Sequence, residues 1–298
     1  MSNPVEDFKT LLLYYTKRAL TYQMDALRAM AGIIRRLSER MKCRFLEGLP
    51  TAAFDLFIVF RRHHSPLYRR AGFPSWSWAG WRGSQAVLDL GDNDFLRQDT
   101  WIVWHKQSPG GVTSLVWDPL ANEEFPLRDF EYVGYRGRHA FKPPCPLHFP
   151  TSRTQPTENL QVAAPDRTYP ILQFWTLSMH FNLTISNPIE GLARIVDENG
   201  MTCGALYPDG LEESTFFNSS GPFELIALSA TPSRPWTWYD SDLGKLLEHI
   251  KEKDEFYNVM VLEWSGPVAE RRGMGLLWKD AVARSLPPGL AWKEILLA

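Results

Sequence analysis

The apolar positions in the first 50 residues recur at the spacing of an α-helix, three and four residues apart. They form two runs, which are Phe8, Leu11, Leu12 and Tyr15, followed by Met24, Leu27, Ala31, Ile34, Leu37 and Met41. Thr21 lies between the runs and is expected to cap the second helix. Gly48 and Pro50 then end the helical pattern. The spacing predicts helices within residues 5–45, and the short apolar stretch 54–60 predicts another.

The pattern changes to the period of a β-strand after Pro74. Trp76 and Trp78 alternate with Ser77, which predicts a strand that carries both indoles on one face. Further apolar and aromatic stretches predict strands at residues 101–106, 114–117, 130–135, 171–184, 192–196, 203–207, 223–229, 257–264 and 268–278. Ser265-Gly266-Pro267 separates the last two, so these two are expected to form a hairpin.

These patterns together predict an α+β fold. A helical segment, residues 1–72, packs on a larger and mostly antiparallel β-rich domain, residues 73–298. Prolines mixed with Ser, Thr and Gln recur through residues 143–170, which predicts a long loop within that domain. A leucine-rich stripe at residues 240–250 predicts one late helix.

The charge of the chain also changes at the boundary after residue 72. The net charge is −2, which gives no reason to expect nucleic acid or a membrane as a partner. Residues 1–72 hold 13 Lys and Arg against 6 Asp and Glu, a net of +7, so the remaining 226 residues carry a net of −9. A basic segment beside an acidic body predicts that the two dock. The alternative is a basic face that binds another domain.

The cysteines and the first residues indicate the compartment. Cys43, Cys145 and Cys203 are far apart in sequence, which fits a reducing environment and argues against a disulfide framework or a Cys-based zinc site. The start of the chain shows no secretory signal, and no apolar run is long enough to span a bilayer. We therefore expect a cytoplasmic protein.

A search for catalytic motifs predicts no enzyme, no cofactor and no metal site. The sequence has no G-x-S-x-G elbow, no P-loop and no H-E-x-x-H. Gly273 and Gly275 begin a dinucleotide fingerprint, but Trp278 takes the place of its third glycine, so they are interpreted as strand glycines. His63 and His64 lie among arginines, whose charge opposes a metal ion.

Two carboxylate arrangements need a separate interpretation. Trp236 to Asp242 places aromatic side chains beside two carboxylates, as a carbohydrate-binding or carbohydrate-active site requires. The simpler interpretation is the start of a helix, with Asp240 as its cap. Glu263 and Glu270 flank the hairpin turn and are expected to face each other, with Arg271 and Arg272 as surface partners.

The most specific segment is Phe73-Pro74-Ser75-Trp76-Ser77-Trp78-Ala79-Gly80-Trp81. It resembles the P-S-W-S-W-A motif that follows the toxic domain in fungal heterokaryon-incompatibility (HET) proteins. Other segments resemble that family in the same order: Tyr15-Thr16-Lys17-Arg18-Ala19-Leu20-Thr21, Asp25-Ala26-Leu27-Arg28-Ala29, Gly48-Leu49-Pro50, Tyr257-Asn258-Val259-Met260, Ala269-Glu270-Arg271 and Trp292-Lys293-Glu294-Ile295. The resemblance spans nearly the whole chain, although residues 83–165 contribute little to it.

The resemblance implies a role in allorecognition and programmed cell death. In the family, a HET domain that resembles TIR-type domains precedes this region, and its motifs Y-x-A-L-S-Y-x-W-G, W-x-D-x-x-C-I and R-x-W-T-x-Q-E are absent here. We therefore expect a non-enzymatic interaction or regulatory module without the toxic domain. It would be a truncated paralogue, a recognition half with a separate partner, or the product of a mis-split gene. The expected partner is a HET-type effector domain or another incompatibility protein.

The candidate structural or interaction residues form two groups. The first group is Trp76, Trp78 and Trp81, for which core packing is expected and a binding surface is the alternative. The second group is Arg35, Arg36, Arg69 and Arg70, which belong to the basic segment and are expected to contribute to docking.

Overall fold

The structure is a computed structural model of the 298-residue chain. It describes residues 4–63, 65–86, 101–117, 147, 155–158, 167–187, 192–210, 217, 221–231 and 255–298. The strand expected at 130–135, the helix expected at 240–250, the candidate carbohydrate site Trp236–Asp242 and most of the proline-rich segment 143–170 lie outside these residues.

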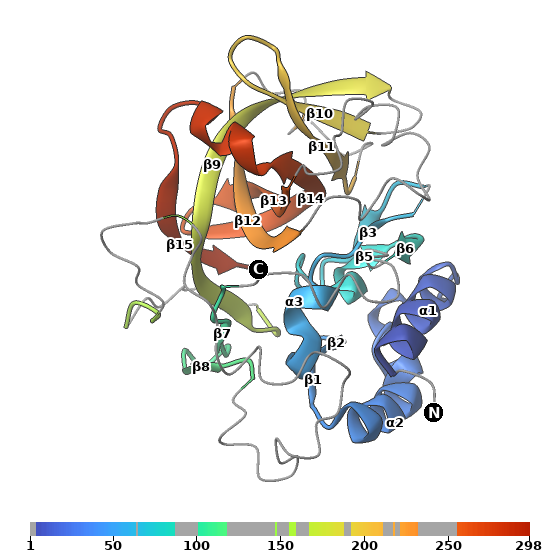
Figure 1. The fold of residues 1–298 in the computed structure, drawn as a ribbon. Helices are drawn as coiled ribbons and strands as arrows, with labels where there is room; N and C mark the ends of the chain where they lie inside the picture. The colour runs from blue at the N-terminus through green and yellow to red at the C-terminus, as the bar shows by residue number, and fades with distance from the viewer. Residues whose placement is uncertain are drawn as a thin grey trace.

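Residues 4–86 form an N-terminal unit of short elements, which lies on one side of the molecule (Figure 1). Its elements are α1 (Pro4–Thr16), two 3-10 turns (Gln23–Asp25 and Arg28–Met30), α2 (Ala31–Met41), β1 (Phe45–Leu46), β2 (Leu49–Pro50), α3 (Phe54–Phe57), β3 (Arg61–Arg62), β4 (Tyr68–Arg69), β5 (Trp81–Arg82) and β6 (Gln85–Ala86). The expected helices are present, but the prediction that Thr21 caps the second one is wrong. Met30 precedes α2 and makes no side-chain capping bond.

Among the described residues, six antiparallel strands close into a ring. In ring order they are β9 (Ile171–Asn187), β12 (Phe223–Thr231), β13 (Phe256–Ser265), β14 (Val268–Trp278), β11 (Thr202–Pro208) and β10 (Leu192–Val196), which pairs back with β9. The expected hairpin is confirmed as β13–β14, in which Glu263 lies opposite Glu270. This ring and the N-terminal helices confirm the α+β fold.

Three further strands extend the ring at β9. β15 (Ala291–Leu297) runs antiparallel to the first half of β9, and Leu297 lies beside Ala269 of β14 in parallel register. β7 (His105–Gln107) pairs with the start of β9, and β8 (Thr113–Leu115) pairs with β7. β9 is long enough to take part in all of these pairings because it runs for 17 residues.

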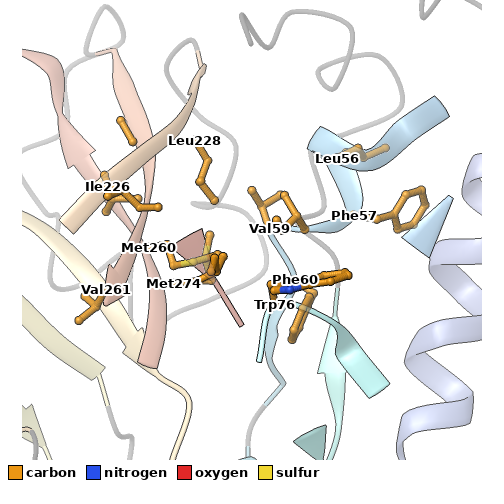
Figure 2. Close-up of a cluster of buried hydrophobic side chains, with 14 of the residues drawn as sticks. Leu56, Phe57, Val59, Phe60, Trp76, Ile226, Leu228, Met260, Val261 and Met274 are labelled. Carbon is orange, nitrogen blue, oxygen red and sulfur yellow. The ribbon is translucent and has the colours of Figure 1, made fainter. Parts of the chain in front are cut away.

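The ring strands are apolar on both faces. Leu225 lies opposite Val261 and Met179, and all three are buried on one face of the ring. Figure 2 shows Met260 and Met274 on the outer face, pointing toward Val59 and Phe60 of the N-terminal unit. Both faces of the ring therefore carry buried apolar side chains, and the unit and the ring share one hydrophobic core.

Glycines permit the close approach of β14 to β11. A Cβ atom at Gly275 would lie 2.3 Å from the carbonyl oxygen of Ala205, and one at Gly273 would lie 2.8 Å from that of Tyr207. Both distances are shorter than real Cβ contacts. The interpretation of Gly273 and Gly275 as strand glycines is confirmed, since both lie within β14.

The prediction of a strand across Trp76–Trp78 is wrong. The segment turns, and residues Trp78–Gly80 form a 3-10 helix capped by the Ser77 hydroxyl, which accepts from the Ala79 N–H at 3.0 Å. The turn is so tight that a Cβ atom at Gly80 would lie 2.2 Å from the Pro74 carbonyl oxygen. Pro74 and Ser77 therefore override the period-two pattern.

A buried ion pair joins the N-terminal unit to the ring. Arg271 of β14 and Asp209, just after β11, are both 0% exposed and make two hydrogen bonds, at 2.7 and 2.9 Å. The remaining guanidinium N–H groups donate to the carbonyl oxygens of Ile58 and Phe60. The expectation that Arg271 is a surface partner of the hairpin carboxylates is therefore wrong. Of these two arginines, only Arg272 forms ion pairs with Glu263 and Glu270.

Candidate interaction surface

The structure divides the sequence-predicted site residues between the interior and the surface. Trp76, Trp78 and Trp81 are at most 2% exposed, and Arg70 is also buried. By contrast, the Arg35 side chain is 85% exposed, and Arg36 lies on the same exposed side of α2. The buried residues shape the N-terminal unit, whereas the exposed ones are available to a partner.

The three indoles fix the turn that carries them. The Trp78 Nε1–H donates to the Gly48 carbonyl at 2.8 Å, and that of Trp81 donates to the Ser75 carbonyl at 2.7 Å. The Trp76 Nε1–H is buried and has no hydrogen-bond partner within the described residues. All three rings belong to the core shared with the ring strands, so they offer no surface to a ligand.

Arg69 and Arg70 hold the same turn through its carbonyl groups. Arg69 donates to the carbonyls of Phe73 and Gly80 at 2.7 and 3.2 Å, and Arg70 donates to that of Ala79 at 3.1 Å. Burial lowers the pKa of both guanidinium groups, and nearby Glu270 opposes this for Arg69. Arg69 lies 3.9 Å from Glu270 of β14, so part of the basic segment does pair with the acidic body.

The exposed apolar side chains concentrate on the N-terminal helices. Seven large apolar side chains are exposed within the described residues, and four of them lie between residues 14 and 33: Tyr14 (63%), Tyr22 (71%), Met24 (59%) and Ile33 (41%). The other three are Val112 and Leu115, in the β7–β8 hairpin, and Met201, in the turn before β11. A surface cluster of this kind is typical of protein interfaces.

Contacts between the helices hold the segment that carries these side chains against α1. Arg40 of α2 forms an ion pair with Asp7 of α1 at 2.7 Å, and the Tyr15 hydroxyl donates to the Ala26 carbonyl at 2.8 Å. These two contacts hold α1 alongside the following segment at both of its ends. Figure 1 places α1 and α2 on the side of the unit away from the ring.

Two arginines in the same stretch of the chain are exposed as well. The Arg28 side chain is 88% exposed, and Arg18 is also exposed. We name the exposed side chains of Tyr14, Arg18, Tyr22, Met24, Arg28 and Ile33 the N-terminal face. Tyr, Met and Arg are enriched at protein interfaces. The face can bind an apolar surface that has acidic residues at its edge.

One polar cluster on the outer face of the ring was missed by the sequence interpretation. The Glu224 carboxylate accepts from the Ser178 hydroxyl at 2.6 Å, from Trp264 Nε1–H at 2.7 Å and from Lys293 at 2.8 and 2.9 Å. His180 Nε2 lies 4.0 Å from the carboxylate. No sequence motif signals this cluster, because its residues come from four strands.

The Glu224 cluster is best explained by structure. Burial raises the pKa of Glu224, but the hydrogen bonds from Lys293, Ser178 and Trp264 outweigh this and leave the pKa below its ordinary value. The Lys293 ammonium lies 4.2 Å from the centre of the Trp264 ring and covers the carboxylate. The cluster therefore holds a paired carboxylate, rather than a carboxyl group poised for proton transfer.

Two further findings concern other kinds of site. Within the described part of the chain, no group of three or more His, Cys, Asp or Glu residues is placed to hold a metal ion. None of the helices described is both long and apolar enough to cross a membrane. Comparisons with protein-family models, with curated protein sequences and with solved structures find no match for the chain.

Proposed function

We propose that this chain is a non-enzymatic interaction module of the heterokaryon-incompatibility type, and that it acts in the cytoplasm. In this proposal the N-terminal face binds a HET-type effector domain, which is the domain that precedes this region in the family that the sequence resembles. The observation that carries the proposal is the concentration of four exposed large apolar side chains between residues 14 and 33.

The composition of the face supports a protein as its ligand. Tyr22 and Met24 protrude from an irregular segment between the helices, with more than half of each side chain exposed. Burying such side chains in an interface contributes the larger part of affinity, since large apolar and aromatic residues dominate binding energy. Arg18 and Arg28 are solvated, so they act mainly on the association rate and the salt dependence.

The test measures binding of the full chain to a separately expressed HET domain from a close relative. We expect binding at low salt and at high salt, with faster association at low salt. The double substitution Tyr22→Ser and Met24→Ser removes two apolar side chains from the face, and the affinity should fall at least about tenfold. The matched control is Val112→Ser with Met201→Ser, which removes two exposed apolar side chains elsewhere and should leave the affinity unchanged.

The charge contribution has its own pair of variants. Arg28→Glu should slow association and weaken the dependence on salt, whereas Arg82→Glu, an exposed arginine on β5, should change neither. All variants are first checked for an unchanged unfolding midpoint. If the HET domain does not bind at either salt concentration while both proteins are folded, the proposal fails. It also fails if the Tyr22/Met24 variant and the control bind equally well.

A further inference from the structure

A short sequence pattern recurs three times in the described chain. An arginine stands three residues before a hydroxyl side chain at Arg18 and Thr21, at Arg35 and Ser38, and at Arg62 and Ser65. A protein kinase with carboxylates in its substrate groove can bind this arginine through paired hydrogen bonds and so place the hydroxyl at the phosphate donor. Such a kinase needs an accessible arginine, a free hydroxyl and a backbone that can extend.

Ser38 has the most favourable sequence but the wrong structure. It follows Arg35 and Arg36, yet it lies inside α2, and its hydroxyl donates to the Cys43 carbonyl. The neighbouring Leu37 and Met41 are buried in the core, so extending this segment would require α2 to leave the unit. The fold therefore protects Ser38.

Ser65 fails for the opposite reason. The serine itself is exposed, but Arg62 is only 2% exposed. The Arg62 guanidinium lies 5.7 Å from the centre of the Tyr207 ring, where it packs against the ring strands. A kinase groove cannot reach the arginine that the pattern requires.

Thr21 meets the first two requirements and lies in no helix or strand, although the Gln23 side chain donates to the Leu20 carbonyl at 2.8 Å, and this bond must open for the segment to extend. Lys17, Arg18 and Thr21 are all exposed, and residues 17–22 form an irregular connection between α1 and the first 3-10 turn. The turn that follows has Tyr22 at its start and no side-chain cap, so the Thr21 hydroxyl is not used there. Within the described residues this hydroxyl makes no hydrogen bond.

We propose that Thr21 is a phosphorylation site for an arginine-directed protein kinase. The Thr21 oxygen attacks the γ-phosphorus of ATP and forms the new P–O bond. The bond from that phosphorus to the β–γ bridging oxygen breaks, ADP leaves with those electrons, and the hydroxyl proton passes to a carboxylate of the kinase. The product carries a charge of about −1.5 to −2 between Arg18 and Tyr22.

The new charge regulates the N-terminal face, and this consequence rests on the proposed function. A phosphate at residue 21 offsets the positive charge of Arg18 and stands near Asp25, which is already negative. A partner with acidic residues at its edge is then repelled from the face rather than attracted to it. Phosphorylation should therefore slow the association of the HET-type domain.

The site is tested without any partner. The full chain is incubated with ATP and the catalytic subunit of an arginine-directed serine/threonine kinase, and the modified residue is identified by mass spectrometry of peptides. Among the three sites of the described chain, we expect phosphate on Thr21 alone. Thr21→Ser should keep the modification, and Arg18→Ala should reduce its rate by at least about tenfold, because a charge-assisted contact is lost. Ser38→Ala and Ser65→Ala should have no effect.

Unfolding the chain provides the decisive control. In urea-denatured chain diluted into the same reaction, Ser38 should become a substrate, because its Arg-Arg-Leu-Ser sequence is then accessible. Modification of Ser38 or Ser65 in the folded chain would overturn the proposal. So would an unmodified Thr21 in a reaction that phosphorylates a free peptide of residues 15–24.

A second measurement tests the regulation. Association of the HET domain with the phosphorylated and unphosphorylated chain is compared at low salt, and we expect slower association after phosphorylation. Thr21→Ala chain treated in the same way should associate at the unmodified rate. If the HET domain fails to bind either form, the proposed function fails while the phosphorylation site stands. If it binds both at the same rate, the proposed regulation is wrong.

Discussion

The N-terminal unit and the strand ring are held together by different kinds of bond. In the ring, successive residues of long strands pair in register, as β13 and β14 do from Phe256 to Ser265. In the unit the strands are only two residues long, and side chains replace the ladder. Indoles and guanidinium groups donate to carbonyls that are distant in the sequence, such as Trp78 to Gly48 and Arg70 to Ala79.

The difference teaches where each region is vulnerable. A strand ladder is held by many equivalent backbone hydrogen bonds, so removing one side chain leaves these bonds in place. In the unit, a single side chain satisfies a buried carbonyl group, and removing it leaves that group without a partner. The ion pair between Arg271 and Asp209 is one point at which the ring enters this side-chain network, and it is fully buried. Substitutions in this ion pair should therefore cause the largest loss of unfolding free energy.

The largest loss of unfolding free energy is expected for Asp209→Ala. The substitution leaves the Arg271 charge fully buried with only the Ile58 and Phe60 carbonyls as partners. Breaking a buried pair by removing one member typically costs about 3–5 kcal/mol. Urea unfolding followed by tryptophan fluorescence measures the loss. Because the pair joins the two regions, we expect the unit to unfold at lower urea than the ring in this variant.

The exposed pair on the same strand is the control. Glu263→Ala removes a partner of Arg272, and the Arg272 side chain is 27% exposed. Partly solvated pairs typically contribute about 0–1 kcal/mol. Equal losses for Asp209→Ala and Glu263→Ala would show that the buried pair does not join the two regions as we describe.

A smaller effect is expected for Trp78→Phe. Phenylalanine keeps an aromatic ring but leaves the Gly48 carbonyl without its donor, which costs about 1–3 kcal/mol. Trp76→Phe, two residues away, is a matched control because the Trp76 Nε1–H has no partner within the described residues. Both changes remove the same volume from a buried site. If Trp78→Phe lowers the unfolding free energy by no more than Trp76→Phe does, packing alone holds the unit.

The sequence predicted the ring far better than the unit. Strands expected at 192–196 and 268–278 are observed with the same bounds. Turn residues mark the end of the first, at residues 197–200, and the start of the second, at residues 265–267. The Trp76–Trp78 segment shows a clear period-two alternation and is nevertheless a turn. Pro74 and Ser77 favour the turn locally, and the indole of Trp78 holds it through the carbonyl of Gly48, 30 residues away. A period-two pattern does not reveal that distant contact.

The candidate surface was only partly visible in the sequence. Basic residues at 35, 36, 69 and 70 follow from composition, but the fold separates them by burying Arg70 and exposing Arg35. The apolar members Tyr22 and Met24 were expected to lie in or beside a capped helix. They are exposed because two short 3-10 turns replace the start of that helix. Exposure depends on packing, which periodicity alone does not determine.

The smallest expected effect on stability comes from the Glu224 carboxylate, a polar group on the ring strands. Its pKa lies below its ordinary value, because hydrogen bonds from Lys293, Ser178 and Trp264 outweigh the effect of burial. The folded chain therefore binds fewer protons at this site than the unfolded chain does, at pH values between the two pKa values. Stability from this group is present above the unfolded pKa of about 4.3 and is lost as the pH falls through the folded value.

Glu224→Gln isolates this contribution, because glutamine keeps the shape but has no acidic proton. We expect the difference in unfolding free energy between the wild type and this variant to shrink as the pH falls from about 6 to about 3. Burial also lowers the pKa of nearby His180, so the comparison is repeated in a His180→Asn background to separate the two groups. The exposed Glu198→Gln serves as a control for the loss of one charge. If the Glu224→Gln difference stayed constant with pH, or grew as the pH fell, the carboxylate would not be stabilised by its three donors. The outer face of the ring would then depend on its ladders alone, and the contrast with the side-chain bonds of the N-terminal unit would be sharper still.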